Sequence, residues 1–156
     1  MRLVPLFENS DILSKFRSAA FTKLVDKEIT KDGSSFICSY VASAVKMLGG
    51  DRIKVYGFSS GENPSAKYFE DEDEEEGHHF AVLDNRYIID PWIHDNFAED
   101  GKPFNKSVFD MNDDKDKELI SYIYGDKKSW TDITSKTDDF KELFPKSVDA
   151  LQNFMK

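Results

Sequence analysis

Apolar residues recur along this chain with two different spacings, and the changes between them divide it into helices and strands. After a capping residue at Asn9 or Ser10, they follow at helical spacing to about Glu28. A second helix is predicted at 36–48, because turn and capping residues precede it and two glycines follow it. One face of this second helix is strongly apolar, so we expect it to be central to the core.

Three short strands are expected after this helix. Residues 52–58 alternate charged and apolar side chains, which is typical of a half-exposed strand. Two further apolar runs, 80–83 and 86–89, are separated by Asp84 and Asn85, residue types that tolerate a positive φ and suit a two-residue hairpin turn. We expect the first strand to pair with the second, in a small antiparallel sheet of about three or four strands.

The last part of the chain is predicted to be helical. Asn112 or Asp113 can cap a helix that ends before Gly125. Residues 140–144 suggest a short helix, and Pro145 opens a final one. No catalytic motif is found here, so this part is the expected place for contacts with a particular substrate.

The composition is that of one acidic domain. Its 156 residues suffice for a single core, and we expect one α+β domain over 1–156, with its core at about 30–95 and a helical part at about 108–156. The net charge of −9 and the isoelectric point near 4.8 argue against nucleic acid and anionic membranes as partners. No membrane-spanning run or cleaved signal peptide is found, so we expect a soluble monomer.

The hairpin brings a histidine and an aspartate together. If a two-residue turn pairs Leu83 with Arg86, His79 lies directly opposite Asp90 and His78 points to the other face. Side chains opposite each other in an antiparallel pair share a face, with Cβ atoms about 5 Å apart, so this carboxylate can orient the imidazole. A turn one residue longer would remove Asp90 as the direct partner. The alternative is a solvent-edge histidine that faces an aspartate by chance.

Cys38 is the only cysteine of the chain, so no intrachain disulfide can form. It falls in the first turn of the predicted 36–48 helix, where the helix dipole favours a thiolate and free backbone N–H groups can bind an oxyanion. The alternative is a packing role, since free cysteines are among the most buried residues. Together with His79 and Asp90, Cys38 has the order of nucleophile, base and orienting group in a Cys-His-Asp triad.

Seven consecutive acidic residues, 70–76, precede the histidines. So acidic a run is expected to form a mobile, solvated loop, and its simplest role is solubility. Because it ends next to the predicted site, it also makes the rim acidic. It is expected to steer a basic protein surface towards the site and to raise the pKa of His79.

At these residues the sequence resembles the papain-like cysteine hydrolases in their bacterial toxin and effector branch, which includes protein-glutamine deamidases. The resemblance covers about 30–95 and rests on four segments, 33–38, 48–50, 77–83 and 87–92. It implies a reduced papain-like fold without a cofactor, in which Cys38 is the nucleophile, His79 the general base and acid, and Asp90 the orienting group. It also implies a location in the bacterial cytoplasm, or export into a target cell without a cleaved signal.

Weaker site candidates follow from the same resemblance. A polar residue before the cysteine helps to build the oxyanion hole in papain-like folds, and Ser34 and Ser35 are in place for this. They also suit a helix cap, so an oxyanion hole of backbone N–H groups is the working assumption. Trp92 is a candidate wall of the active-site cleft, with a core plug as the alternative.

Three classes of function remain open. The first is a cysteine amide hydrolase with a protein substrate, foremost a glutamine deamidase and otherwise a protease or cell-wall amidase. The second is a metal site, but the chain has no Cys-x-x-Cys or His-x-x-x-His spacing, so no metal is expected. The third is a non-catalytic acidic interaction or inhibitor protein.

Overall fold

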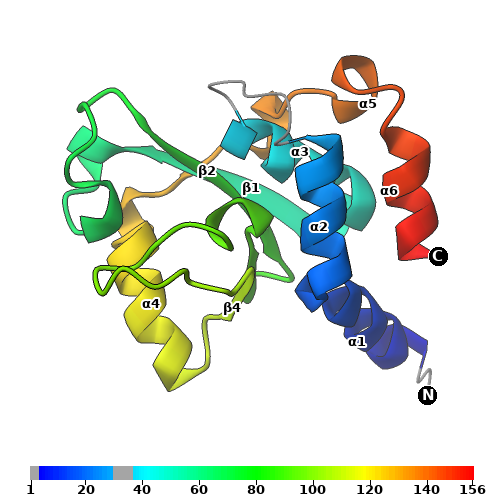
Figure 1. Cartoon of the computed structure of the whole chain (residues 1–156), viewed down its shortest axis with the longest axis horizontal. Coiled ribbons are helices and arrows are strands. Elements are labelled where there is room, and N and C mark those ends of the chain that lie inside the picture. The colour runs from blue at the N-terminus through cyan, green and yellow to red at the C-terminus, as the bar shows by residue number, and fades with distance from the viewer. Residues whose placement is uncertain (1–3, 30–36) are drawn as a thin grey trace.

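One five-stranded antiparallel sheet lies between two groups of helices in the computed structural model, which describes residues 4–29 and 37–156 (Figure 1). Its strand order is β4-β3-β2-β1-β5, formed by β1 (Ile53–Ser59), β2 (Gly77–Leu83), β3 (Tyr87–Ile89), β4 (Val108–Asp110) and β5 (Thr131–Asp132). The predicted α+β class is confirmed, and so is the pairing of β1 with β2. Strands β4 and β5 were not predicted, because two or three residues are too few to show a period.

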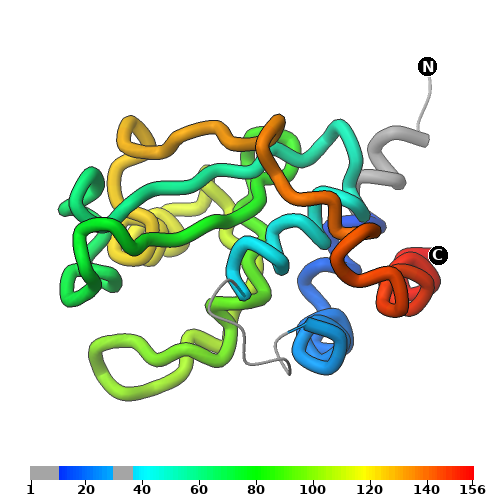
Figure 2. Tube along the Cα trace, turned by 90° about the horizontal axis from the view of Figure 1, so that it is seen from above, coloured from blue at the N-terminus to red at the C-terminus, as the bar shows by residue number. Residues whose placement is uncertain are grey.

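Helix α3 (Ile37–Gly49) is the predicted central helix, and it packs on β1 and β2. Figure 2 shows it between the sheet and the remaining helices of that side. Those helices are α1 (Val4–Arg17), α2 (Ala19–Glu28), α5 (Phe140–Leu143) and α6 (Val148–Met155). The buried side chains of α2, α3, α5 and α6 form one apolar core with the sheet.

The opposite face of the sheet is covered by α4 (Asp114–Tyr124) and by the short turn η4 (Lys67–Phe69). Strand β2 contributes to the cores on both faces of the sheet, because its side chains alternate between the faces. Ala81 and Leu83 belong to the α3 core, and Phe80 and Val82 to the α4 core.

The N-terminal helix expected from about residue 10 to Glu28 begins earlier, at Val4, so the predicted cap at Asn9 or Ser10 is wrong. It is also two helices, because Ser18 interrupts it. Its hydroxyl donates to the Lys15 carbonyl at 2.8 Å and accepts from the Phe21 N–H at 3.1 Å. Ser18 therefore ends α1 and caps α2, as serine does when its side chain competes with helical hydrogen bonds.

The C-terminal part is helical as predicted, except that Pro145 does not open the last helix. Asp113 caps α4 through a 3.0 Å bond from the Asp116 N–H, and Gly125 follows the helix with a φ of 66°. The last helix begins at Val148, three residues after Pro145. No helix among residues 4–29 and 37–156 combines the length and the apolar character needed to cross a bilayer.

The predicted register of the β2–β3 hairpin is wrong by one residue. Leu83 pairs with Tyr87 rather than with Arg86. Asp84 and Asn85 have the expected positive φ values, 53° and 56°, and the Arg86 N–H closes their turn on the Leu83 carbonyl at 3.0 Å. Arg86 itself stays outside the β2–β3 ladder, as in a bulge.

Strand β4 accounts for the position of Arg86. The guanidinium donates two hydrogen bonds to the Asp110 carboxylate, both 2.9 Å long. The Arg86 carbonyl accepts from the Met111 N–H, also at 2.9 Å. Arg86 is therefore hydrogen-bonded to the end of β4, on the side of β3 away from β2. The pairing of β3 with β2 begins only at the next residue, Tyr87.

Candidate active site

The one-residue shift changes which histidine meets Asp90. Continuing the observed register places Asp90 opposite Phe80, on the face that His78 shares, and places His79 opposite Pro91. The predicted pairing of His79 with Asp90 is therefore wrong. His78, which was assigned to the other face, is the residue that binds Asp90.

His78 and Asp90 form a buried pair. The His78 Nε2 atom lies 2.7 Å from Asp90 Oδ2, and the two residues are 1% and 2% exposed. The same carboxylate oxygen accepts a 2.6 Å hydrogen bond from the Tyr124 hydroxyl, at the end of α4. A buried carboxylate is costly unless it is paired and hydrogen-bonded, and these two donors satisfy that need.

Aromatic rings enclose the His78 imidazole. The rings of Phe69 and Trp92 lie 5.1 Å and 4.7 Å away between centroids, and Phe80 and Tyr124 lie 6.0 Å away. They keep water from the His78–Asp90 pair, where charges interact more strongly than in solvent. Trp92, from the turn η5 (Pro91–Ile93), thus covers the histidine.

Cys38 is the second residue of α3 and is half-buried. Its position in the first helical turn is as predicted, with backbone N–H groups that have no helical partner. Burial raises the pKa of the thiol, but contact with the His78 imidazole and the charge of that ring outweigh it, aided by the His79 backbone N–H. The pKa of Cys38 is therefore lowered, which favours the thiolate.

The pKa of His78 moves the other way. Burial lowers it, but the charge and hydrogen bond of Asp90, followed by the contact with Cys38, raise the pKa to about 10. Opposite shifts in two neighbouring groups favour a thiolate–imidazolium pair at neutral pH.

The second ring nitrogen of His78 is the one available to the thiol. Within the part of the chain that the structure describes, Nδ1 is buried and has no hydrogen bond of regular geometry. Because Asp90 occupies Nε2, Nδ1 is left for Cys38, which interacts with the ring. Such hydrogen bonds are often long or poorly aligned until a substrate is bound.

His79 lies beside this pair in a different role. Its ring packs over Gly57, the residue opposite it on β1, where an added Cβ would come within 2.8 Å of His79 Cδ2. Burial and the charge of His78 lower the pKa of His79, and Asp138 only partly opposes them. The expected rise in its pKa is therefore wrong, and His79 is neutral at pH 7.

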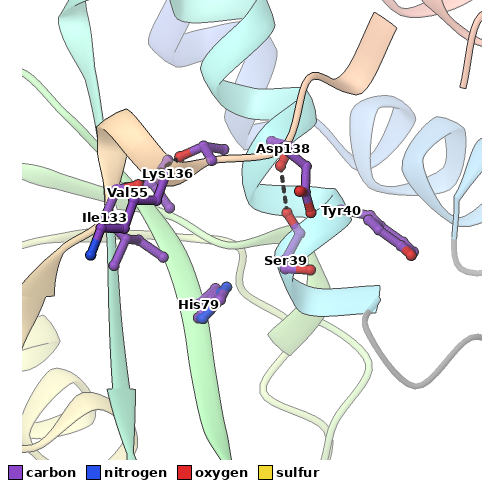
Figure 3. Close-up of a pocket in the computed structure, with 9 residues that line it drawn as sticks. Ser39, Tyr40, Val55, His79, Ile133, Lys136 and Asp138 are labelled. Atoms are coloured by element: carbon purple, nitrogen blue, oxygen red, sulfur yellow. Dashed lines mark hydrogen bonds between the residues drawn. The ribbon is translucent and has the colours of Figure 1, made fainter. Parts of the chain in front are cut away.

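Two cavities meet at this point. An open cavity of about 670 Å³ is lined by Cys38 and both histidines, and a neighbouring one of about 320 Å³ contains His79 as well. They share Ser39, His79 and Ile133, and Cys38 lines the larger of the two. Figure 3 shows the second cavity, with His79 on β2, Ser39 and Tyr40 on α3, and Lys136 across from them.

Three predicted site residues have other outcomes. Ser34 and Ser35 lie outside the described residues. Trp92 does not line the cavity at Cys38; it packs in both apolar cores and against His78.

Tyr124 is the residue at this site that sequence reasoning missed. It was read only as part of the apolar stripe of its helix. A fully buried tyrosine needs a partner for its hydroxyl, and the only signal in the sequence was its place next to the helix-ending Gly125. Burial, followed by the nearby Asp90, raises the Tyr124 pKa well above its ordinary value, so Tyr124 stays a donor.

Within the described part of the chain, no group of three or more His, Cys, Asp and Glu side chains is arranged to hold a metal ion. Comparison of the chain with protein-family models, curated proteins and solved structures gave no significant match.

Proposed function

We propose that this protein is a cysteine-dependent amide hydrolase in which Cys38 is the nucleophile, His78 the general acid and base, and Asp90 the orienting group. One observation carries the proposal. A histidine that is 1% exposed is bound through Nε2 to a buried carboxylate and presents its other nitrogen towards the only thiol of the chain, in the wall of an open cavity.

The first half of the reaction needs the thiolate and the imidazolium. The Cys38 Sγ attacks the carbonyl carbon of a carboxamide, and the carbonyl electron pair moves to oxygen, where N–H groups of the first α3 turn stabilise the charge. As the oxyanion collapses, the C–N bond breaks and His78 Nδ1 gives its proton to the leaving nitrogen. Ammonia or an amine departs and a thioester to Cys38 remains.

Water completes the cycle. His78, now neutral, takes a proton from water as the hydroxide oxygen attacks the thioester carbon, and Cys38 leaves as the thiolate. The imidazolium and the thiolate are thereby restored. Throughout the cycle Asp90 accepts a hydrogen bond from the Nε2–H group of His78, and this bond keeps Nδ1 directed at the reacting atoms.

Among amide substrates, the glutamine side chain of a target protein is our first choice, and it rests on the sequence resemblance. A cysteine protease or a cell-wall amidase uses the same steps with another leaving nitrogen. Mass spectrometry of candidate proteins after incubation separates these cases. A small mass gain without cleavage indicates deamidation, and new chain termini indicate proteolysis.

The neighbouring histidines supply a matched test of the site. We expect His78→Ala to lower turnover by about 100- to 10,000-fold, the usual contribution of general acid–base catalysis, and to slow the alkylation of Cys38 at pH 6–7. His79→Ala should keep most of the thiol reactivity, because the backbone N–H that faces the sulfur remains.

The alkylation rate of Cys38, followed by whole-protein mass, measures this without a known substrate. Fast reaction below about pH 8 in the wild type and in His79→Ala, but not in His78→Ala, supports the proposal. Ordinary thiol titration in all three would favour a non-catalytic interaction protein.

A further inference from the structure

The cavity at Cys38 carries a one-sided charge. Three glutamates line it, Glu62, Glu75 and Glu76, and neither a lysine nor an arginine is among its lining residues. The same cavity is lined by His78, which is 1% exposed and whose Nδ1 has no hydrogen-bond partner among the described residues. The three glutamates, the acidic wall of the cavity, therefore face the same space as the Cys38–His78 pair.

The fold brings these carboxylates together from two segments. Glu62 ends the turn η3 (Ser60–Glu62), and the other two end the acidic run. The Ser60 N–H donates to the Glu76 carbonyl at 2.6 Å, and the Gly61 N–H donates to the Glu74 carbonyl at 3.0 Å. The end of the run, expected to be a mobile loop, is thus tied to η3 by backbone hydrogen bonds.

Among the described residues, no lysine or arginine pairs with these three glutamates. In the described residues, the lysine and arginine ion pairs all go to aspartates, and none reaches Glu62, Glu75 or Glu76. A neighbouring carboxyl shows the effect of crowded like charges. The pKa of Glu72 is raised, mainly by a hydrogen bond with Glu76 and also by the charges of Glu76 and Asp73. The carboxylates therefore remain available to a cation from outside.

We propose that this cavity selects polypeptide substrates that carry a lysine or arginine beside the attacked amide, with the basic side chain held at Glu62, Glu75 and Glu76. The proposal deepens the hydrolase function above and rests on it. An acidic neighbour at the same position would be repelled by the wall, so discrimination comes from both signs of charge.

Charged thiol reagents test the wall without a known substrate, because Cys38 is the only cysteine. The probes are the trimethylammonium-ethyl and the sulfonato-ethyl methanethiosulfonates, which form a mixed disulfide with the thiolate and release methanesulfinate. The ratio of cationic to anionic modification rates reports the potential at the thiol. We expect the triple variant Glu62→Gln, Glu75→Gln, Glu76→Gln to lower this ratio by about 10-fold.

A control of equal charge change distinguishes local recognition from net charge. Glu70→Gln, Asp71→Asn, Asp73→Asn also removes three charges, all of them from the acidic run, but these residues do not line the cavity. We expect this control to lower the ratio by less than about 3-fold at physiological salt. Equal effects of the two variants, or no effect of either, would overturn the inference. Glu76→Gln alone serves if the cavity triple variant does not fold.

Peptide substrates give the second arm. With active enzyme, a lysine beside the target glutamine should raise kcat/KM relative to a glutamate there, and the cavity variant should remove most of that preference. If the hydrolase proposal fails, no peptide is turned over, although the cavity variant still lowers the ratio of cationic to anionic modification rates. Failure of this inference would show as turnover without charge preference.

Discussion

Two adjacent histidines have opposite protonation states because they face opposite sides of one strand. His78 lies in the aromatic α4 core, where Asp90 makes the charged imidazolium favourable. His79 lies at the cavities on the α3 side, where burial and its charged neighbour favour the neutral ring. A single strand thus brings one charged and one neutral imidazole to the cavity that Cys38 lines.

The Cys38–His78 pair exchanges a proton on folding with little net change in proton count. Unfolded, at about pH 8, the thiol with its ordinary pKa of 9.0 holds the proton and the imidazole with its ordinary 6.5 does not. Folded, the raised pKa keeps the proton on His78 and the lowered one removes it from Cys38. Between about pH 6.5 and 9, and above the lowered thiol pKa, the pair therefore adds almost no pH dependence to the free energy of unfolding.

Cys38→Ala should reveal how much His78 contributes to the pH dependence of the free energy of unfolding. Asp90 still raises its pKa, so the folded variant binds one more proton than the unfolded one above about pH 6.5. Its free energy of unfolding should fall as the pH rises from about 7 to about 9, relative to the wild type, by at most about 1.4 kcal/mol per pH unit. Urea unfolding of both proteins at several pH values measures this. Parallel curves would show that no proton passes from Cys38 to His78 on folding.

At the scale of elements, the end of α4 supports the site from a distance. The Tyr124 carbonyl accepts hydrogen bonds from Asn63 Nδ2 at 2.8 Å and Trp130 Nε1 at 2.7 Å, while its hydroxyl binds Asp90. Gly125 ends the helix, and an added Cβ there would lie 2.3 Å from Asn63 Oδ1. The position of the orienting carboxylate thus depends on how one helix ends.

Gly125→Ala should therefore reduce stability and turnover together. Gly50 supplies a control for the positive φ, since its φ of 60° is similar to the 66° of Gly125 but nothing lies within 4 Å of an added Cβ. Gly125 differs in having both the contact with Asn63 and a ψ of −142°, outside the left-handed helical region. We expect Gly50→Ala to cost about 1–2 kcal/mol from its backbone conformation alone, and Gly125→Ala to cost at least about 2 kcal/mol more. Urea unfolding measures both variants, and equal losses would mean that neither the contact with Asn63 nor the backbone conformation of Gly125 constrains this helix end.

At the scale of the whole molecule, the net charge of −9 opposes the folded state, because folding brings the acidic side chains closer together. The seven acids of 70–76 concentrate this repulsion on one side of the Cys38 cavity. Stability is therefore expected to depend on ionic strength.

The melting temperature should rise as sodium chloride increases from about 0.02 M to about 0.3 M, because salt screens repulsion between exposed charges. The variant Glu70→Gln, Asp71→Asn, Asp73→Asn should show a smaller rise. Thermal unfolding followed by circular dichroism at several salt concentrations gives the comparison. An unchanged salt dependence in the variant would place the repulsion elsewhere on the surface.

The sequence by itself determined the α+β class, the central helix with Cys38 in its first turn, the β1–β2 pairing and the positive φ values of the hairpin turn. These features depend on neighbours close in the chain, such as caps, glycine stops and apolar periods, so local patterns carry them. Asp90 was also a candidate from its place at the end of the hairpin.

Only the tertiary structure decided which histidine that aspartate binds. The partner of Asp90 depends on whether the hairpin loop has two or three residues. The loop includes Arg86 because Asp110 and Met111, from a distant segment, hold this residue outside the ladder. Since side chains alternate with a period of two, this single shift moves the partner of Asp90 from His79 to His78. Tyr124 completes the site for the same reason: long-range packing, which no local pattern encodes, brings it to Asp90.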